Sequence, residues 1–249
     1  IRNTFRFMLG NLKDNFTKQN FDKIKINELD ELEQYILHKI FEIGISVQEN
    51  LKNYNFHKLY KELLNFCTLD LSSFYFDIRK DVLYCDDLES KKRKDCVIVL
   101  NIILETMLKW FAPILVFTTE EIYGLINKEI KSIHENLFAK IPANWKNKKL
   151  EEKWSKLYKI KQEANIAIET KRAKKEIGSS LEAEIELNLN KEQFEILENL
   201  NLAEYFITSK AEKKLSEKES IIVKKAKGKK CERCWKILDN KCYRENCPI

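Results

Sequence analysis

Residues 96–117 read CVIVLNIILETMLKWFAPILVF, the most apolar stretch of this 249-residue chain. A leucine recurs every four residues, at Leu100, Leu104 and Leu108, the spacing of one face of an α-helix. Four residues interrupt the apolar run: Asn101, Glu105, Lys109 and Pro113. A membrane-spanning helix needs about 20 predominantly apolar residues. We therefore expect a core helix over about residues 88–111, at the centre of a helix bundle, and no membrane span.

Helical periodicity continues on both sides of this segment, and only 5 glycines and 3 prolines interrupt it. The pattern predicts further helices over about residues 1–13, 29–47, 56–76 and 150–175. Residues 129–149 are polar and irregular, as expected of a linker. The predicted fold is mainly α, with a helix bundle over residues 1–128.

The period of the sequence changes from Leu181 onward. Apolar and polar residues alternate over 181–189, which predicts a half-buried strand. We expect a helix over 190–200 and two more strands, at 205–208 and 220–223. Together with the long helix, residues 150–228 are thus predicted to form a small α+β domain, followed by a separate segment at 229–249.

The seven cysteines fall into two groups. Cys67, Cys85 and Cys96 are isolated among apolar residues and are predicted to be reduced, partly buried thiols. An odd count without a secretory segment indicates a reducing compartment, which we take to be the cytoplasm. The other four lie within the last 19 residues, at Cys231, Cys234, Cys242 and Cys247.

A C-x-x-C start followed by further cysteines predicts a structural zinc site. Zn²⁺ prefers four ligands in a tetrahedron, with sulfur at about 2.3 Å. We expect one Zn²⁺ per chain, with all four C-terminal cysteines as candidate ligands. Residues 229–249 are therefore predicted to form a zinc knuckle.

Excess positive charge is confined to the C-terminal part. Residues 208–249 hold 13 Lys and Arg against 6 Asp and Glu, whereas the rest of the chain is nearly neutral. Basic residues beside a zinc knuckle indicate a nucleic-acid partner, although a solvated lysine-rich surface would look the same. No glycine-rich phosphate loop and no nucleophile with an adjacent base is found. The chain taken alone is expected to bind rather than catalyse.

Five motifs in order resemble the C-terminal part of bacterial isoleucyl-tRNA synthetases. They are IRNTFRFMLGNL at 1–12, NFCTLDLSSFYFDIRKDVLY at 65–84, WFAPILVFTTEEI at 110–122, IGSSLEA at 177–183 and KCERCW at 230–235. Ile1 is already in phase with the first helix, so we expect a fragment of a longer chain.

This resemblance implies a function. The parent enzyme would be a class I ligase that uses ATP to attach isoleucine to tRNA, and its catalytic and editing domains would precede Ile1. The helix bundle would hold the anticodon arm of tRNA(Ile), and the knuckle would fold over the anticodon. The implied partners are that tRNA and the enzyme's own catalytic domain, with a monomeric state and no membrane association. The fragment alone is predicted to be inactive.

The same resemblance makes Arg233 and Trp235 the best candidates to touch the anticodon loop, although Trp235 could instead only shield the zinc sulfurs. Arg2 and Arg6 share a helix face and could contact phosphates, or form ion pairs within the bundle. Lys171 and Arg172 are further candidates for phosphate contact, but basic residues in a last helical turn also complement the helix dipole.

The cysteine spacing departs from the family pattern, in which the second zinc pair is usually another C-x-x-C. Cys242 and Cys247 are separated by four residues, and Cys247-Pro248-Ile249 resembles the start of a pair whose last cysteine would be residue 250. Either Cys242 is the fourth ligand, or the fourth ligand lies past the end.

A different class of function also fits the tail: a free-standing zinc knuckle that binds nucleic acid or a protein. The related valyl and leucyl enzymes are a weaker alternative, because the Cys-x-Arg-Cys-Trp knuckle speaks against them.

Overall fold

The computed structural model describes residues 1–12, 16–127, 131–239, 242 and 244. The chain divides into two compact units. The first contains residues 1–79 and 88–147, and the second contains residues 80–87 and 148–249. No described helix is long and apolar enough to cross a membrane.

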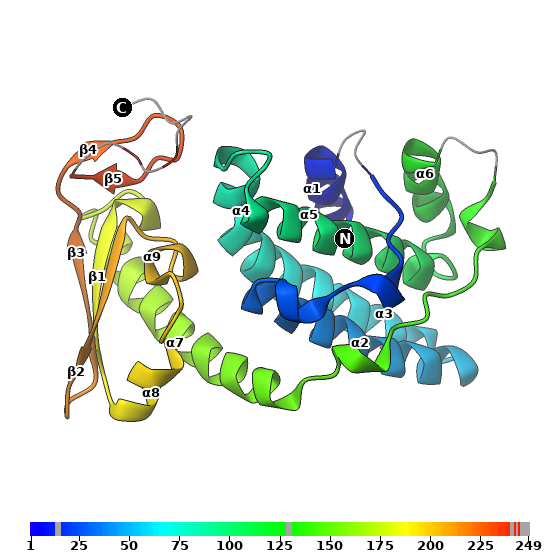
Figure 1. The fold of residues 1–249 in the computed structure, drawn as a ribbon, viewed down its shortest axis with the longest axis horizontal. Coiled ribbons are helices and arrows are strands. Elements are labelled where there is room, and N and C mark those ends of the chain that lie inside the picture. The colour runs from blue at the N-terminus through cyan, green and yellow to red at the C-terminus, as the bar shows by residue number, and fades with distance from the viewer. Residues whose placement is uncertain (13–15, 128–130, 240–241, 243, 245–249) are drawn as a thin grey trace. The chain divides into compact units, whose positions relative to one another are not determined.

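The first unit is a helix bundle around α5. Its helices are α1 (Arg2–Leu12), α2 (Glu31–Lys52), α3 (Phe56–Asn65), the π-helical η4 (Phe66–Tyr75), the start of α4 (Phe76–Cys85), α5 (Lys91–Phe111) and α6 (Val116–Ile126). Helix α5 packs against α1, α2 and α6 (Figure 1). Most of its residues are buried, from Asp95 to Phe111. The apolar stretch at 96–111 is therefore the centre of the bundle, as predicted.

The helical run from Phe56 to Cys85 is continuous but changes its hydrogen-bond pattern in the middle. Within η4 the hydroxyls of Ser72 and Ser73 donate to the carbonyls of Cys67 and Thr68, at 2.7 Å and 2.8 Å. Both partners lie five residues earlier in the chain, as in a π-helix. Leu71, Phe74 and Tyr75 are buried within this π-helical segment.

A buried ion pair lies inside the bundle. Arg79 donates to Glu33 through Nε and Nη2, at 2.8 Å and 2.5 Å, and the hydroxyl of Tyr75 donates to the same carboxylate at 3.0 Å. Glu33 is fully buried and Arg79 is 4% exposed. Two charges taken out of water this far need such bidentate geometry to be tolerated.

The second unit is a small α+β fold. Its elements are α7 (Lys148–Ala173), β1 (Ala183–Leu189), α8 (Lys191–Ile196), α9 (Leu202–Tyr205), β2 (Lys210–Leu215), β3 (Ser220–Lys225), β4 (Lys229–Lys230) and β5 (Ile237–Leu238). The sheet order is β2-β1-β3, with β2 parallel and β3 antiparallel to β1. Helix α7 packs against this sheet (Figure 1). The mainly α fold with a small α+β part is thus confirmed, whereas the predicted boundaries at residues 128, 150 and 228 stay predictions.

The strand predicted at 205–208 is wrong. Tyr205 ends α9, and Ile207 has a positive φ of 57°. These apolar residues pack rather than pair: the ring of Tyr205 lies edge-on to that of Trp154, with 5.7 Å between centroids. The strand is instead the more polar Lys210–Leu215, which forms one edge of the sheet and is largely exposed.

The segment 129–149, predicted as a linker, has buried residues where it is described. Ile133 and Trp145 are 3% and 1% exposed. The short helical turns that contain them pack on α6 and α2. Both turns lie in the same compact unit as the bundle.

Gly228, just before the β4–β5 hairpin, has a φ of +125°, and a Cβ built on it would lie 2.3 Å from the carbonyl oxygen of Leu238. We expect Gly228→Ala to lower the free energy of unfolding of the second unit by about 1–3 kcal/mol. Alanine disfavours this backbone conformation, and its Cβ would force the hairpin to distort. Differential scanning calorimetry of the full chain measures this as a lower unfolding temperature.

Gly10→Ala is the matched control. Gly10 lies inside α1 with open space around it, so the same change should stabilise the chain by about 0.5–1 kcal/mol. An unaltered unfolding temperature for Gly228→Ala would contradict the close approach of Gly228 to Leu238.

Candidate functional site

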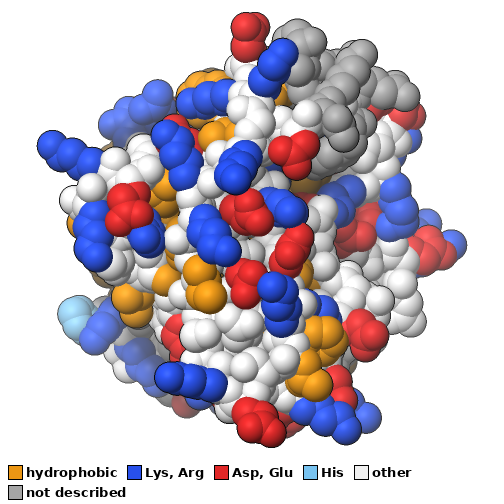
Figure 2. All heavy atoms as spheres, turned by 90° about the vertical axis from the view of Figure 1, so that its left-hand side faces the viewer, with side chains coloured by type: hydrophobic (Ala, Val, Ile, Leu, Met, Phe, Trp, Pro, Cys, Tyr) orange, Lys and Arg blue, Asp and Glu red, His pale blue; other side chains and the backbone are white. Residues whose placement is uncertain are grey.

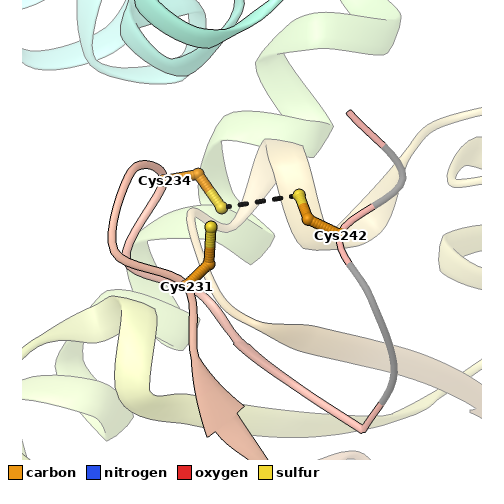
Figure 3. A group of neighbouring side chains, drawn as sticks. All are labelled: Cys231, Cys234 and Cys242. Atoms are coloured by element: carbon orange, nitrogen blue, oxygen red, sulfur yellow. Dashed lines mark hydrogen bonds between the residues drawn. The ribbon is translucent and has the colours of Figure 1, made fainter. Parts of the chain in front are cut away.

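Three of the predicted zinc ligands come together. The sulfur atoms of Cys231, Cys234 and Cys242 point toward one another (Figure 3) and all lie within 4.8 Å of each other. Cys234 Sγ and Cys242 Sγ are 3.9 Å apart. Sulfurs held at about 2.3 Å by a tetrahedral Zn²⁺ lie about 3.8 Å from one another, whereas a disulfide would bring them to about 2.05 Å. The donor set and its spacing therefore fit a zinc ion.

Backbone hydrogen bonds shape the C-x-x-C turn. The N–H of Cys231 donates to the carbonyl of Lys236, and the N–H of Trp235 donates to the carbonyl of Cys231, both at 2.9 Å. The two-residue strands β4 and β5 pair on either side of this turn. The turn directs both of its thiols inward, and Cys242 approaches them from the segment after β5.

Burial makes the thiol of Cys234 hard to ionise without a cation. Burial, together with the neighbouring Cys231 and Cys242, raises the pKa of Cys234 to about 11. Zinc binds the thiolate form, so the ion must displace protons that the apo site holds firmly. Three buried cysteines so close together are a donor set well suited to a zinc ion.

The fourth predicted ligand, Cys247, lies outside the described residues. A different cysteine packs beside the cluster: Cys85, at the end of α4, is 5% exposed and lies among the same buried residues. Its sulfur is not in the group whose members lie within 4.8 Å of each other. Cys85 is therefore a packing neighbour of the three-thiol site, and it is a free, buried thiol as predicted.

The two residues expected to contact RNA flank Cys234 and face solvent. Trp235 is 60% exposed, its indole Nε1 donates to the carbonyl of Glu232 at 3.1 Å, and Lys230 Nζ lies 5.9 Å from its ring centroid. Its φ is +60°, a strained value for a large side chain. The turn holds this conformation and leaves the indole outside, where a ligand can reach it.

Arg233 is also exposed, but part of its guanidinium is engaged. Its Nη2 donates to the carbonyl of Tyr84, in α4, at 3.1 Å. Because its side chain is exposed, a phosphate or a base edge can reach Arg233.

The other predicted RNA contacts have different surroundings. Lys171 pairs with Glu176 at 2.7 Å, and Arg172 pairs with Glu169 at 2.6 Å. These local ion pairs support the simpler interpretation that both residues belong to an ordinary helix end. Arg2 and Arg6 are exposed on α1, in the other unit.

Sequence reasoning misses the charged residues that hold the knuckle. In the sequence, Asp86 is simply an acidic residue shortly before the helix predicted over about 88–111, yet its Oδ1 accepts from Arg244 Nε at 2.6 Å. Lys236 is 5% exposed, and burial lowers its pKa while Asp81 opposes that shift. The sequence shows Lys236 and Arg244 close to the predicted zinc ligands. It does not show that Asp81 and Asp86, far earlier in the chain, are their partners.

Comparison with known proteins identifies the chain's relatives. The family model described as anticodon-binding domain of tRNA ligase matches residues 33–187. The isoleucine–tRNA ligase of Pelagibacter ubique is 56% identical over 99% of this chain and 27% of its own length. The isoleucine–tRNA ligases of Agrobacterium fabrum and Gluconobacter oxydans are 37% and 38% identical over 95% and 96% of the chain, and over 25% of their own length.

This chain spans about a quarter of the length of these relatives. The match includes the knuckle, because 99% of the chain is aligned in the first comparison. The resemblance predicted from the five motifs is thus confirmed. The chain belongs to the family of anticodon-binding domains of tRNA ligases.

Proposed function

We propose that this chain recognises the anticodon arm of tRNA(Ile) as the C-terminal part of an isoleucine–tRNA ligase. ATP-dependent attachment of isoleucine would be carried out by a catalytic domain elsewhere in the same enzyme, working as a monomer in the cytoplasm. Support comes from the family match and from relatives similar over nearly the whole chain. These matches favour this proposal over a free-standing zinc knuckle.

One observation carries the proposal: an exposed arginine and an exposed tryptophan flank a cysteine of a three-thiol cluster. Unpaired anticodon bases can stack on an indole and be read along their edges by a guanidinium. A zinc ion, when bound, would hold the turn that presents both side chains. We propose Cys231, Cys234 and Cys242 as three of its ligands and Cys247 as the fourth.

Charge distribution alone would not locate such a surface. On the face shown in Figure 2, Lys and Arg side chains alternate with Asp and Glu side chains. Lys210 and Lys214, for example, pair with Glu184 and Glu186 along the sheet. The exposed Arg233 and Trp235 beside Cys234, rather than a uniformly basic face, therefore support the proposal of RNA recognition.

Equilibrium filter binding of the full chain to tRNA transcripts tests this function. We expect tRNA(Ile) to bind more tightly than unrelated tRNAs, with an affinity that falls as salt rises because phosphate contacts release counterions. Equal affinity for all tRNAs would reduce the proposal to non-specific polyanion binding.

Trp235→Ala should weaken tRNA(Ile) binding about tenfold or more, because stacking of one base on an aromatic ring contributes about 1–3 kcal/mol. Fluorescence anisotropy with labelled tRNA measures the change. Trp235→Phe, which keeps a flat ring, should lose much less, and zinc content should be unaltered in both. Unaltered affinity of Trp235→Ala would mean that the indole only covers the metal site.

A further inference from the structure

The C-terminal end of α4 contacts the knuckle through both backbone and side chains. The carbonyl of Tyr84 accepts from Arg233, at 3.1 Å, and the carboxylate of Asp86 accepts from Arg244, at 2.6 Å. Cys85, between them, packs against the three clustered cysteines. Residues 80–87 and the knuckle belong to the same compact unit. Tyr84 and Cys85 therefore meet the turn that carries the predicted RNA contacts, and Asp86 meets Arg244, which follows Cys242 by two residues.

The ion pair in this contact is shielded from water. The side chain of Arg244 is 5% exposed and that of Asp86 is 18% exposed. A further group of buried charges lies close by: Lys236 and Arg244 both attract Asp81, opposing the rise in the pKa of Asp81 that burial causes. Charge-assisted hydrogen bonds in such surroundings are short and directional. Arg244 also follows the metal-site Cys242 by two residues, so this pair holds the chain next to the cluster.

A helix end is suited to orienting a guanidinium. The last carbonyls of a helix have no partner within the helix and carry partial negative charge. The Tyr84 carbonyl is one of these, and it accepts from one of the five donors of Arg233. This contact restricts the long arginine side chain, and Arg233 is exposed, so a ligand can reach it.

We propose that the end of α4, through the Tyr84 carbonyl and Asp86, is the positioning element that aims Arg233 at RNA. Asp86 is a positioning residue that acts through Arg244 and the knuckle turn, and it does not itself touch RNA. This inference rests on the proposed function and extends it to a segment far from the knuckle in sequence. It also explains why a carboxylate lies beside a surface proposed to bind a polyanion.

The sign of one mutational effect separates positioning from simple electrostatics. Removing a negative charge near an RNA-binding surface should strengthen binding if Asp86 acts only through its charge. Asp86→Asn should instead weaken tRNA(Ile) binding about tenfold, because Arg244 loses its ionised partner and Arg233 its fixed direction. Asp86→Glu keeps the charge and should retain most of the affinity.

The experiment measures tRNA(Ile) affinity of the full chain with Asp86→Asn, Arg233→Gln and both changes together, alongside zinc content. If Asp86 acts by aiming Arg233, the double variant should bind no more weakly than Arg233→Gln alone. Glu89→Gln removes the same charge three residues away, where the carboxylate is 83% exposed and pairs with Lys94. This control should bind as tightly as the unchanged chain or slightly more tightly.

Three results would overturn the inference while leaving the proposed function intact, provided that the unchanged chain binds tRNA(Ile). The first is unaltered or tighter binding by Asp86→Asn. The second is full additivity with Arg233→Gln. The third is loss of zinc from Asp86→Asn, which would make the residue a support for the metal site. Failure of the unchanged chain to bind tRNA(Ile) would instead contradict the proposed function itself.

Discussion

Cys231→Ser is expected to abolish stoichiometric zinc binding and to weaken tRNA(Ile) binding about a hundredfold. Cys231 is fully buried, and its sulfur lies in the group with Cys234 and Cys242. Structural zinc supplies much of the folding free energy of small knuckles, about 10–16 kcal/mol in zinc-finger peptides. Without the metal, the strained turn at Trp235 should relax, and Trp235 and Arg233 should both lose their fixed positions. Base stacking on the indole and hydrogen bonding by the guanidinium would then be lost together.

Elemental analysis after dialysis, paired with anisotropy on labelled tRNA, measures both effects. Cys85→Ser is the matched control: the same chemical change at a buried thiol beside the cluster should leave about one zinc per chain, because its sulfur is outside the ligand group. Retention of zinc and of affinity by Cys231→Ser would contradict the proposed metal site. Loss of zinc from Cys85→Ser would instead make Cys85 a ligand.

Arg79→Met should lower the free energy of unfolding by about 3–5 kcal/mol, the usual cost of removing one partner of a buried ion pair. The change removes both guanidinium bonds from the fully buried Glu33 and leaves the hydroxyl of Tyr75 donating to its carboxylate. Urea denaturation measures the loss as a lower urea concentration at the midpoint of unfolding, with an unaltered dependence of the unfolding free energy on urea.

Two further variants test whether charge burial is the cause. Lys25→Met breaks an ion pair whose side chains are 75% and 66% exposed, so it should cost about 0–1 kcal/mol. Glu33→Leu combined with Arg79→Met removes both charges and should recover part of the stability. A cost below about 1 kcal/mol for Arg79→Met would show that Glu33 finds water or another donor.

The helices of the bundle could be predicted because their information is local. Leu100, Leu104 and Leu108 repeat at helical spacing, and all three are buried. The π-helical segment Phe66–Tyr75 could not be predicted, because its buried residues recur at three- and four-residue spacing, which fits a regular α-helix equally well. The apolar residues at 205–208 led to a wrong strand prediction, because Tyr205 packs against Trp154 of α7 instead of pairing in the sheet. The strand is the largely exposed Lys210–Leu215. An edge strand needs little apolar surface, so its sequence carries a weak signal.

The metal site was partly predictable for a similar reason. Cys231 and Cys234 stand in a C-x-x-C turn, which is a local pattern, and Cys242 joins them as one of the alternatives allowed. What surrounds the site was not predictable, since Arg244 and Asp86 are 158 residues apart. Their pairing depends on the folded path of the chain, which no spacing in the sequence encodes.

An anticodon transplant tests most directly whether this chain reads the anticodon of tRNA(Ile). The affinity of the full chain is measured for tRNA(Ile), for an unrelated tRNA, and for that unrelated tRNA carrying the isoleucine anticodon stem-loop. We predict that the transplanted tRNA binds within a few-fold of tRNA(Ile) and at least about tenfold more tightly than its parent, since reading of unpaired bases distinguishes them. If the transplanted tRNA binds no more tightly than its unrelated parent, this chain does not read the anticodon of tRNA(Ile).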